Sequence, residues 1–254
     1  MEKYTSKEMM AIAAARCIKD SDIVFCGTGI SMLAAMAAKH INAKNSVIIF
    51  ETGAIGASLA DLPMAVGDPR VMYNADIFGT LADSFAFMQN RFTGKKITGI
   101  LGAAQIDKYG NLNSTVIGDY FNPTVRFSGS GGGSDVASFA NRVIIFMKHE
   151  KRRFVEKLDY LTSPGWLDGY DSRKKAGLAR GGAYVVITDM GVLGFDKKSK
   201  RMYLKGYYSD IKQKLIVDNI GFEIDASKAA QIKPPSKEDL FVLRNKCDPQ
   251  RLIL

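Results

Sequence analysis

The chain has 254 residues, of which 46% are hydrophobic and 24% are charged, a composition typical of a folded globular protein and not of a disordered one. Its longest run without a charged residue, Ile23–Ala38, has 16 residues, whereas a membrane-spanning helix needs about 20 apolar residues. The net charge of +9 favours contact with anionic groups such as phosphates, but no nucleic-acid-binding motif accompanies the basic runs at 148–153 and 197–201, which we interpret as solvated surface.

Cysteine and histidine are both scarce. The three cysteines contain no C-x-x-C pair, which argues against a disulfide framework, and the two histidines leave little from which to build a metal site or a Ser-His hydrolase. The apolar run Met9–Ala15 lacks the basic-then-apolar order of a secretory signal. We therefore expect a cytoplasmic protein with no metal site, no membrane contact and no nucleic-acid partner.

The first fifty residues alternate between helical and strand patterns. Thr5-Ser6-Lys7-Glu8 has the spacing of a helix capping box, and apolar residues then recur at helical spacing, which predicts a helix over 6–19. The next predicted elements are a strand over 22–26, a glycine turn at 27–29, an Ala-rich helix over 30–41 and a strand over 46–50.

Similar patterns continue along the rest of the chain. Further strands are predicted over 97–102, 142–147 and 184–187, helices over 82–91, 136–141 and 237–246, and an antiparallel hairpin from 191–195 and 202–204. Continuous apolar strands suit a parallel sheet that is covered on both faces. We therefore expect an α/β fold with an open, largely parallel central sheet, helices on both faces and a C-terminal antiparallel hairpin, in a single domain over 1–254.

Two glycine-rich segments are candidate binding loops. Gly27-Thr28-Gly29 follows a strand and precedes a helix, where backbone N–H groups can hold a phosphate or carboxylate, but a purely structural turn explains it equally well. The segment 127–135 is rich in Gly and Ser and can present successive N–H groups to an anion. A flexible surface loop is the alternative, and the strand candidates on both sides favour a site.

Glu51 is the candidate catalytic residue. It lies where an apolar strand ends and a glycine-containing turn begins, and ligands of open α/β sheets bind at the carboxyl ends of strands. A carboxylate buried at this position needs a partner or a function. An acid in an ordinary loop is the alternative interpretation.

Several segments together resemble one known family, the family I CoA-transferases, and within it the B subunits of the glutaconate enzymes. The resemblance covers about residues 5–250 and is specific in the order and spacing of its segments. These segments are V-I-I-F-E-T-G at 47–53, G-A-A-Q-I-D-K-Y-G-N-L-N-S-T at 102–115, I-G-D-Y at 117–120, R-F-S-G-S-G-G at 126–132, H-E-K-R-R-F at 149–154 and T-S-P-G-W-L-D-G at 162–169.

The resemblance implies a function. It implies transfer of coenzyme A from an acyl-CoA to a free carboxylic acid, with glutaconate- or glutarate-like dicarboxylates as acids, through a glutamyl-CoA thioester on Glu51. The oxyanion motif falls on Gly131 and Gly132, and Gly27 and Gly29 are further candidates for contact with CoA. The resemblance also implies a homologous A-type subunit in a hetero-oligomer, and coenzyme A as a substrate moiety without a permanently bound cofactor.

Some residues depart from the family pattern. Thr52 replaces the serine that commonly follows the glutamate, Phe50 precedes it where other branches have serine, and residues 73–96 match the glutaconate enzymes poorly. The alternatives are a CoA-thioester decarboxylase or hydrolase on the same scaffold and a non-catalytic subunit that binds a phosphorylated ligand. An NAD-dependent oxidoreductase is least favoured, because the full glycine fingerprint is missing. The presence of Glu51 favours the transferase.

Overall fold

The computed structural model describes residues 2–59, 61–178 and 180–254. The chain divides into two compact units, Met1–Leu101 with Pro234–Leu254 and Gly102–Lys233. The single domain expected over 1–254 stays a prediction.

The strands of the first unit follow the order β5-β1-β2-β3-β4. Strand β1 (Ile23–Phe25) lies between β2 (Val47–Ile49) and β5 (Ile97–Gly102), and both neighbours run parallel to it. Strands β3 (Ala54–Ile55) and β4 (Ile77–Phe78) extend the β2 side in antiparallel pairing. The parallel core therefore has an antiparallel edge beyond β2.

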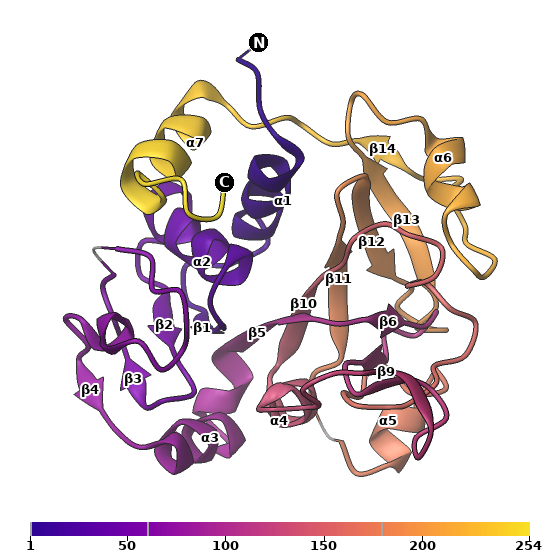
Figure 1. The fold of residues 1–254 in the computed structure, drawn as a ribbon, viewed down its shortest axis with the longest axis horizontal. Helices are drawn as coiled ribbons and strands as arrows, with labels where there is room; N and C mark the ends of the chain where they lie inside the picture. Colours follow the sequence, from indigo (N-terminus) through magenta and orange to yellow (C-terminus); the bar gives the residue numbers. More distant parts are fainter. Residues whose placement is uncertain (1, 60, 179) are drawn as a thin grey trace. The chain divides into compact units, whose positions relative to one another are not determined.

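The helices of the first unit come from both ends of the chain (Figure 1). They are α1 (Ser6–Ala15), α2 (Ile30–Ile41), α3 (Leu81–Gln89), α7 (Lys237–Val242) with a π-helical turn over Leu243–Cys247, and two short 3-10 turns at Pro69–Met72 and Thr93–Lys96. Helix α2 buries all seven residues from Met32 to Ala38, four of which are alanines, and α1 and α7 pack against it. None of the helices in the described ranges is long and apolar enough to cross a membrane.

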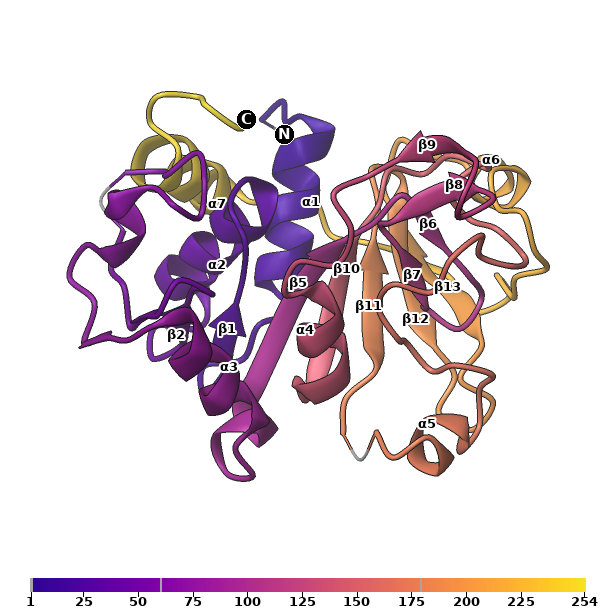
Figure 2. The same cartoon turned by 60° about the horizontal axis from the view of Figure 1, so that its bottom comes forward.

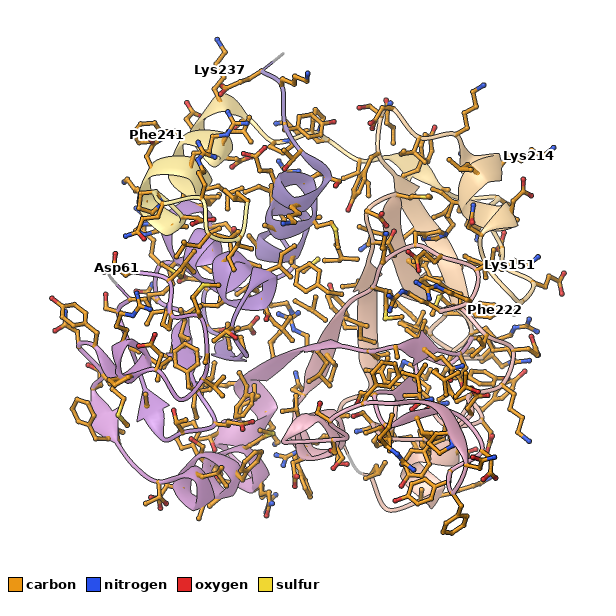
Figure 3. All side chains as sticks on the ribbon, in the orientation of Figure 1. Asp61, Lys151, Lys214, Phe222, Lys237 and Phe241 are labelled. Carbon is orange, nitrogen blue, oxygen red and sulfur yellow. The ribbon has the colours of Figure 1, made fainter. Side chains whose placement is uncertain are left out.

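The C-terminal helix is fixed to the N-terminal one by ion pairs. Arg244 contacts both carboxylate oxygens of Glu8, at 2.5 and 3.0 Å, and Arg16 contacts Asp239 at 2.9 Å. On its outer face, Phe241 is 58% exposed and points away from the unit (Figure 3). Ion pairs as well as apolar packing therefore hold the N-terminal and C-terminal helices of the chain together in this unit.

The second unit has strand order β14-β13-β12-β11-β10. Strands β10 (Arg142–Phe146) and β11 (Ala183–Ile187) are parallel, β12 (Gly191–Phe195) and β13 (Met202–Tyr207) form an antiparallel hairpin beside β11, and β14 (Ala230–Gln231) runs parallel to β13. Figure 2 shows this sheet with the remaining elements of the unit. These are the hairpins β6–β7 (Gln105–Ile106, Leu112–Asn113) and β8–β9 (Val116–Gly118, Pro123–Arg126) and the helices α4 (Gly133–Phe139), α5 (Ser172–Lys175) and α6 (Gln213–Asp218).

Most of the elements predicted from apolar patterns are confirmed. Helix α2 has the predicted bounds, and the capping box at Thr5 and Glu8 is formed, although α1 ends at Ala15 and not at residue 19. Both sets of strands are mixed: the first unit has parallel strands at its centre, and the second unit combines the parallel pair β10–β11 with the predicted C-terminal hairpin. The short hairpins and the edge strands β3 and β4 were not predicted from the sequence.

Candidate active site

Glu51 occupies a tight turn between β2 and β3. The N–H of Gly53 donates to the carbonyl of Phe50 at 3.1 Å, and the N–H of Phe50 donates to the carbonyl of Ala54 at 3.0 Å. Glu51 and Thr52 are therefore the two central residues of the turn, and the Glu51 side chain is half-buried. The carboxyl end of a buried parallel strand thus presents this carboxylate, as the sequence predicts.

The turn is packed closely against a second backbone segment. The N–H of Gly79 donates to the carbonyl of Gly53 at 2.9 Å. Gly53 has a φ of +109°, and a Cβ at this position would lie 2.0 Å from the Gly79 oxygen. Only glycine satisfies both the backbone conformation and this approach.

The Gly27-Thr28-Gly29 segment follows the neighbouring strand. The residue just before it, Cys26, donates its N–H to the carbonyl of Ile49 at 3.4 Å, so the carboxyl ends of β1 and β2 are adjacent. Gly29, with a φ of +78°, precedes the first turn of α2, which contains no acidic residue. A Cβ at Gly27 or Gly29 would meet nothing within 4 Å, so the space in front of this segment is open.

The structure therefore brings Glu51, Gly27 and Gly29 together at the carboxyl ends of β1 and β2 in the first unit. The thiol of Cys26 lies beside them but is fully buried, and burial raises its pKa to about 12. The thiol stays protonated at neutral pH and is not a competing nucleophile.

Gly131 and Gly132 lie in the second unit, on the loop between β9 and α4. The loop is tied at its start by Ser114, whose hydroxyl donates to the carbonyl of Gly129 at 3.0 Å. Ser130 holds its end, where its carbonyl and hydroxyl accept the N–H groups of the first two helical residues at 2.9 and 3.0 Å. Within the described part of the chain, the N–H groups of Gly131 and Gly132 have no acceptor, and Gly131 is exposed.

The geometry of this loop leaves the N–H groups of Gly131 and Gly132 accessible to a ligand. The φ of Gly131 is +48°, and nothing lies within 4 Å of the position of a Cβ there. Glu51 and this pair belong to different units, so their joint action stays a prediction.

Two of the other segments that carry the family resemblance have a structural role. The side-chain oxygen of Asn111 accepts the N–H groups of Gly165 and Leu167 at 2.8 and 3.0 Å, and its amide donates to Asp107 at 2.8 Å. Asp107 is half-buried, and desolvation raises the pKa of its carboxyl. The segments 102–115 and 162–169 therefore bind each other and form a scaffold beneath the glycine loop.

The basic run at 148–153 is a surface ion-pair cluster. Glu150 accepts from Lys148 at 2.9 Å, Arg152 at 2.8 Å and Arg153 at 3.1 Å, and these bonds lower the pKa of its carboxyl to about 2. Lys151 points outward from the same turn (Figure 3). This arrangement agrees with the interpretation as solvated surface for the charged residues of the run, but not for His149, which is 3% exposed because its ring packs into the unit.

Comparison with known proteins decides the family. A family model described as Coenzyme A transferase matches residues 7–219. The chain belongs to the coenzyme A transferase family. This membership confirms the resemblance and the expectation of a CoA-transferase.

The family relatives cover nearly the whole chain. The chain is 42% identical over 249 residues to the B subunit of glutaconate CoA-transferase from Acidaminococcus fermentans, a match that covers 97% of this chain and 93% of the relative. It is 35% identical over 245 residues to the B subunit of 3-oxoadipate CoA-transferase from Pseudomonas knackmussii, with coverage of 96% and 94%. Both relatives are B subunits of transferases.

Solved structures confirm the fold class. The crystal structure of glutaconate coenzyme A-transferase from Acidaminococcus fermentans matches with a TM-score of 0.95 at 40% identity, over 99% of this chain and 97% of that chain. The decarboxylase AibA/AibB matches with a TM-score of 0.83 at 18% identity, over 98% and 97%. The second likeness is one of fold alone.

Proposed function

We propose that this chain is the glutamate-bearing B subunit of an acyl-CoA:carboxylate CoA-transferase, that it works with a homologous A-type subunit, and that Glu51 is its nucleophile. The observation that carries the proposal is the position of Glu51 in a tight, glycine-packed turn at the carboxyl end of β2. A turn of this kind holds a carboxylate at a fixed place while leaving it accessible to a ligand.

The chemistry needs no general base, because a carboxylate is already ionised at neutral pH. Glu51 attacks the thioester carbonyl, the C–S bond breaks, and a mixed anhydride and CoA thiolate result. The thiolate then attacks the Glu51 carbonyl, releases the first acid and leaves CoA bound to the enzyme as a glutamyl thioester. An incoming carboxylate reverses these steps and departs as the new acyl-CoA.

The glycine pair, Gly131 and Gly132, stabilises the negative charge of the tetrahedral intermediates. Each tetrahedral intermediate carries an oxyanion, and the N–H groups of Gly131 and Gly132 are donors without acceptors in the described chain. Loss of one such donor typically lowers the rate by a factor of about 100 or more. Gly27 and Gly29 contribute open backbone beside Glu51 for contact with CoA.

Dicarboxylic acids are the proposed substrate class. The names of the two B-subunit relatives refer to glutaconate and 3-oxoadipate, which both carry two carboxylates. CoA itself serves as a substrate moiety, and no permanently bound cofactor takes part in these steps.

The test is mass spectrometry of the complex formed with the A-type subunit. Incubation with glutaryl-CoA or glutaconyl-CoA without an acceptor should add the mass of CoA less one water to this chain at Glu51. Acetate should then discharge the adduct. Glu51→Ala should form none, whereas Glu223→Gln, a change to an exposed acid in the second unit, should behave as the parent.

Other outcomes would replace the proposal. Consumption of acyl-CoA by the parent complex without an adduct would indicate a decarboxylase or hydrolase. Binding of acyl-CoA without consumption or adduct would indicate a non-catalytic subunit that binds a phosphorylated ligand.

A further inference from the structure

The carbonyl of Phe50, the residue before Glu51, accepts two hydrogen bonds. One comes from the N–H of Gly53 at 3.1 Å and closes the turn. The other comes from the hydroxyl of Ser84 at 2.8 Å, a bond between groups 34 residues apart in the sequence. Ser84 is 0% exposed.

The direction of this second bond is unusual for a serine inside a helix. A helical serine commonly bonds the carbonyl four residues before it, which for Ser84 would be that of Thr80. Here the N–H of Ser84 donates to that carbonyl, at 3.2 Å, and the hydroxyl leaves the helix to reach Phe50. The side chain therefore bonds another segment and not its own helix.

The N-terminus of helix α3, from which Ser84 makes this contact, is itself fixed by hydrogen bonds. Its N-terminus carries a complete capping box, in which Thr80 and Asp83 exchange hydrogen bonds. The preceding residue, Gly79, bonds Gly53 at 2.9 Å. The start of α3 thus holds the turn on both sides of Glu51, at Phe50 through Ser84 and at Gly53 through Gly79.

We propose that Ser84 is a positioning residue for the Glu51 nucleophile, an inference that rests on the proposed function. The hydroxyl fixes the orientation of the peptide group that joins Phe50 to Glu51. Rotation of that peptide moves the Glu51 side chain, and small displacements of a nucleophile from its attack geometry lower rates steeply. The residue lies in 73–96, where the sequence matches the glutaconate enzymes poorly.

Ser84→Ala tests the proposal against a matched control, Ser46→Ala. Ser46 is also buried, and its hydroxyl donates to the carbonyl of Ala43 at 2.7 Å, just before the start of β2, at the end opposite Glu51. Each variant loses one hydroxyl-to-carbonyl bond. In the complex with the A-type subunit, Ser84→Ala should slow glutamyl-CoA formation at saturating acyl-CoA by about tenfold with little change in KM. Ser46→Ala should leave this rate unchanged.

A second pair of variants isolates the hydroxyl. Ser84→Thr and Ser84→Val add nearly the same volume, but only threonine keeps the hydroxyl donor. The threonine variant should therefore form the glutamyl-CoA adduct about tenfold faster than the valine variant. This comparison decides the proposal if Ser84→Ala fails to fold. Equal rates for the Thr and Val variants would overturn the proposal. Equal losses of rate in Ser84→Ala and Ser46→Ala would overturn it as well.

The same measurements separate this inference from the proposed function. If Glu51→Ala retained the adduct and the activity, the nucleophile would be wrong and Ser84 could not position it. If Glu51→Ala is inactive and Ser84→Ala reacts like the parent, the nucleophile stands and the role of Ser84 fails.

Discussion

Ser114 and Gly129 are joined by two hydrogen bonds, one in each direction. The Ser114 hydroxyl donates to the Gly129 carbonyl at 3.0 Å, and the Gly129 N–H donates to the Ser114 carbonyl at 3.2 Å. Ser114 is held in turn by Thr162, whose hydroxyl accepts its N–H at 3.0 Å. The glycine loop is therefore fixed two residues before Gly131.

Ser114→Ala should loosen this attachment. Loss of one part-buried hydrogen bond costs about 1 kcal/mol of stability, which leaves the chain folded. Because the free N–H groups of the loop would be less well ordered, the proposed mechanism predicts a rate of adduct formation lower by about tenfold. The control is Ser199→Ala, which removes a hydroxyl bonded to Asp196 in the exposed β12–β13 turn. A Ser114→Ala variant as fast as this control would show that the loop does not depend on the bond.

Arg173 should contribute strongly to stability. Its guanidinium donates to five carbonyl oxygens on three segments and is 3% exposed. Burial lowers its pKa to about 10, so it stays charged at neutral pH. Arg173→Met leaves these carbonyls without their donor and should lower the free energy of unfolding by more than about 3 kcal/mol in urea titrations. Arg152→Met, at a 76% exposed side chain, should change it by less than about 0.5 kcal/mol.

Gly53→Ala should damage the nucleophile turn. The new Cβ would lie 2.0 Å from the Gly79 oxygen, and the backbone φ of +109° is one that alanine rarely adopts. We expect a loss of at least about 2 kcal/mol in thermal or urea unfolding and a large loss of adduct formation. Gly67→Ala, where nothing lies within 4 Å of the added atom, is the control and should be nearly neutral. Equal behaviour of the two variants would contradict the close approach at Gly53.

His149 should make stability depend on pH. Its ring is buried between Thr188 and the carbonyl of Ile216, at 3.2 and 2.9 Å, and burial lowers its pKa. Below an unfolded pKa of about 6.5 the unfolded chain takes up a proton that the folded chain does not, so the free energy of unfolding falls as the pH drops. Urea titrations between about pH 7.5 and 5.5 should show this loss, and His149→Gln should reduce the slope. His40 also has a lowered pKa and should account for part of what remains. An unchanged slope in the variant would exclude His149 as a source.

The sequence predicts those parts of the molecule that local patterns control. The Ala-rich stretch 30–41 forms α2 with the predicted bounds because its composition and its burial agree. The end of the apolar run at Phe50 marks the turn that carries Glu51, and the glycines at 27 and 29 mark the loop on the neighbouring strand. Because β1 and β2 pair in parallel, the turn and the loop lie side by side at the carboxyl ends of these two strands.

Features that depend on distant contacts were not predictable in this way. Strands β3 and β4 have two residues each, too few to show a period, and they form by pairing in turn, β3 with β2 and β4 with β3. The hydroxyl of Ser84 acts on a carbonyl 34 residues away, and nothing in its local sequence distinguishes it from an ordinary helical serine. Arg173 stands among other basic residues of a short helix, and only the folded loops converge on it.

The closure of the first unit by residues 234–254 also determines the order in which the molecule is completed during translation. The ribosome makes the chain from its N-terminus, so all of Gly102–Lys233 is synthesised before α7 can reach its place against α2. Until then Arg244, an ion-pair partner of the Glu8 carboxylate, is absent and the α7-facing surface of α2 stays uncovered. The unit that carries Glu51 is therefore completed only after the whole of the other unit has been synthesised.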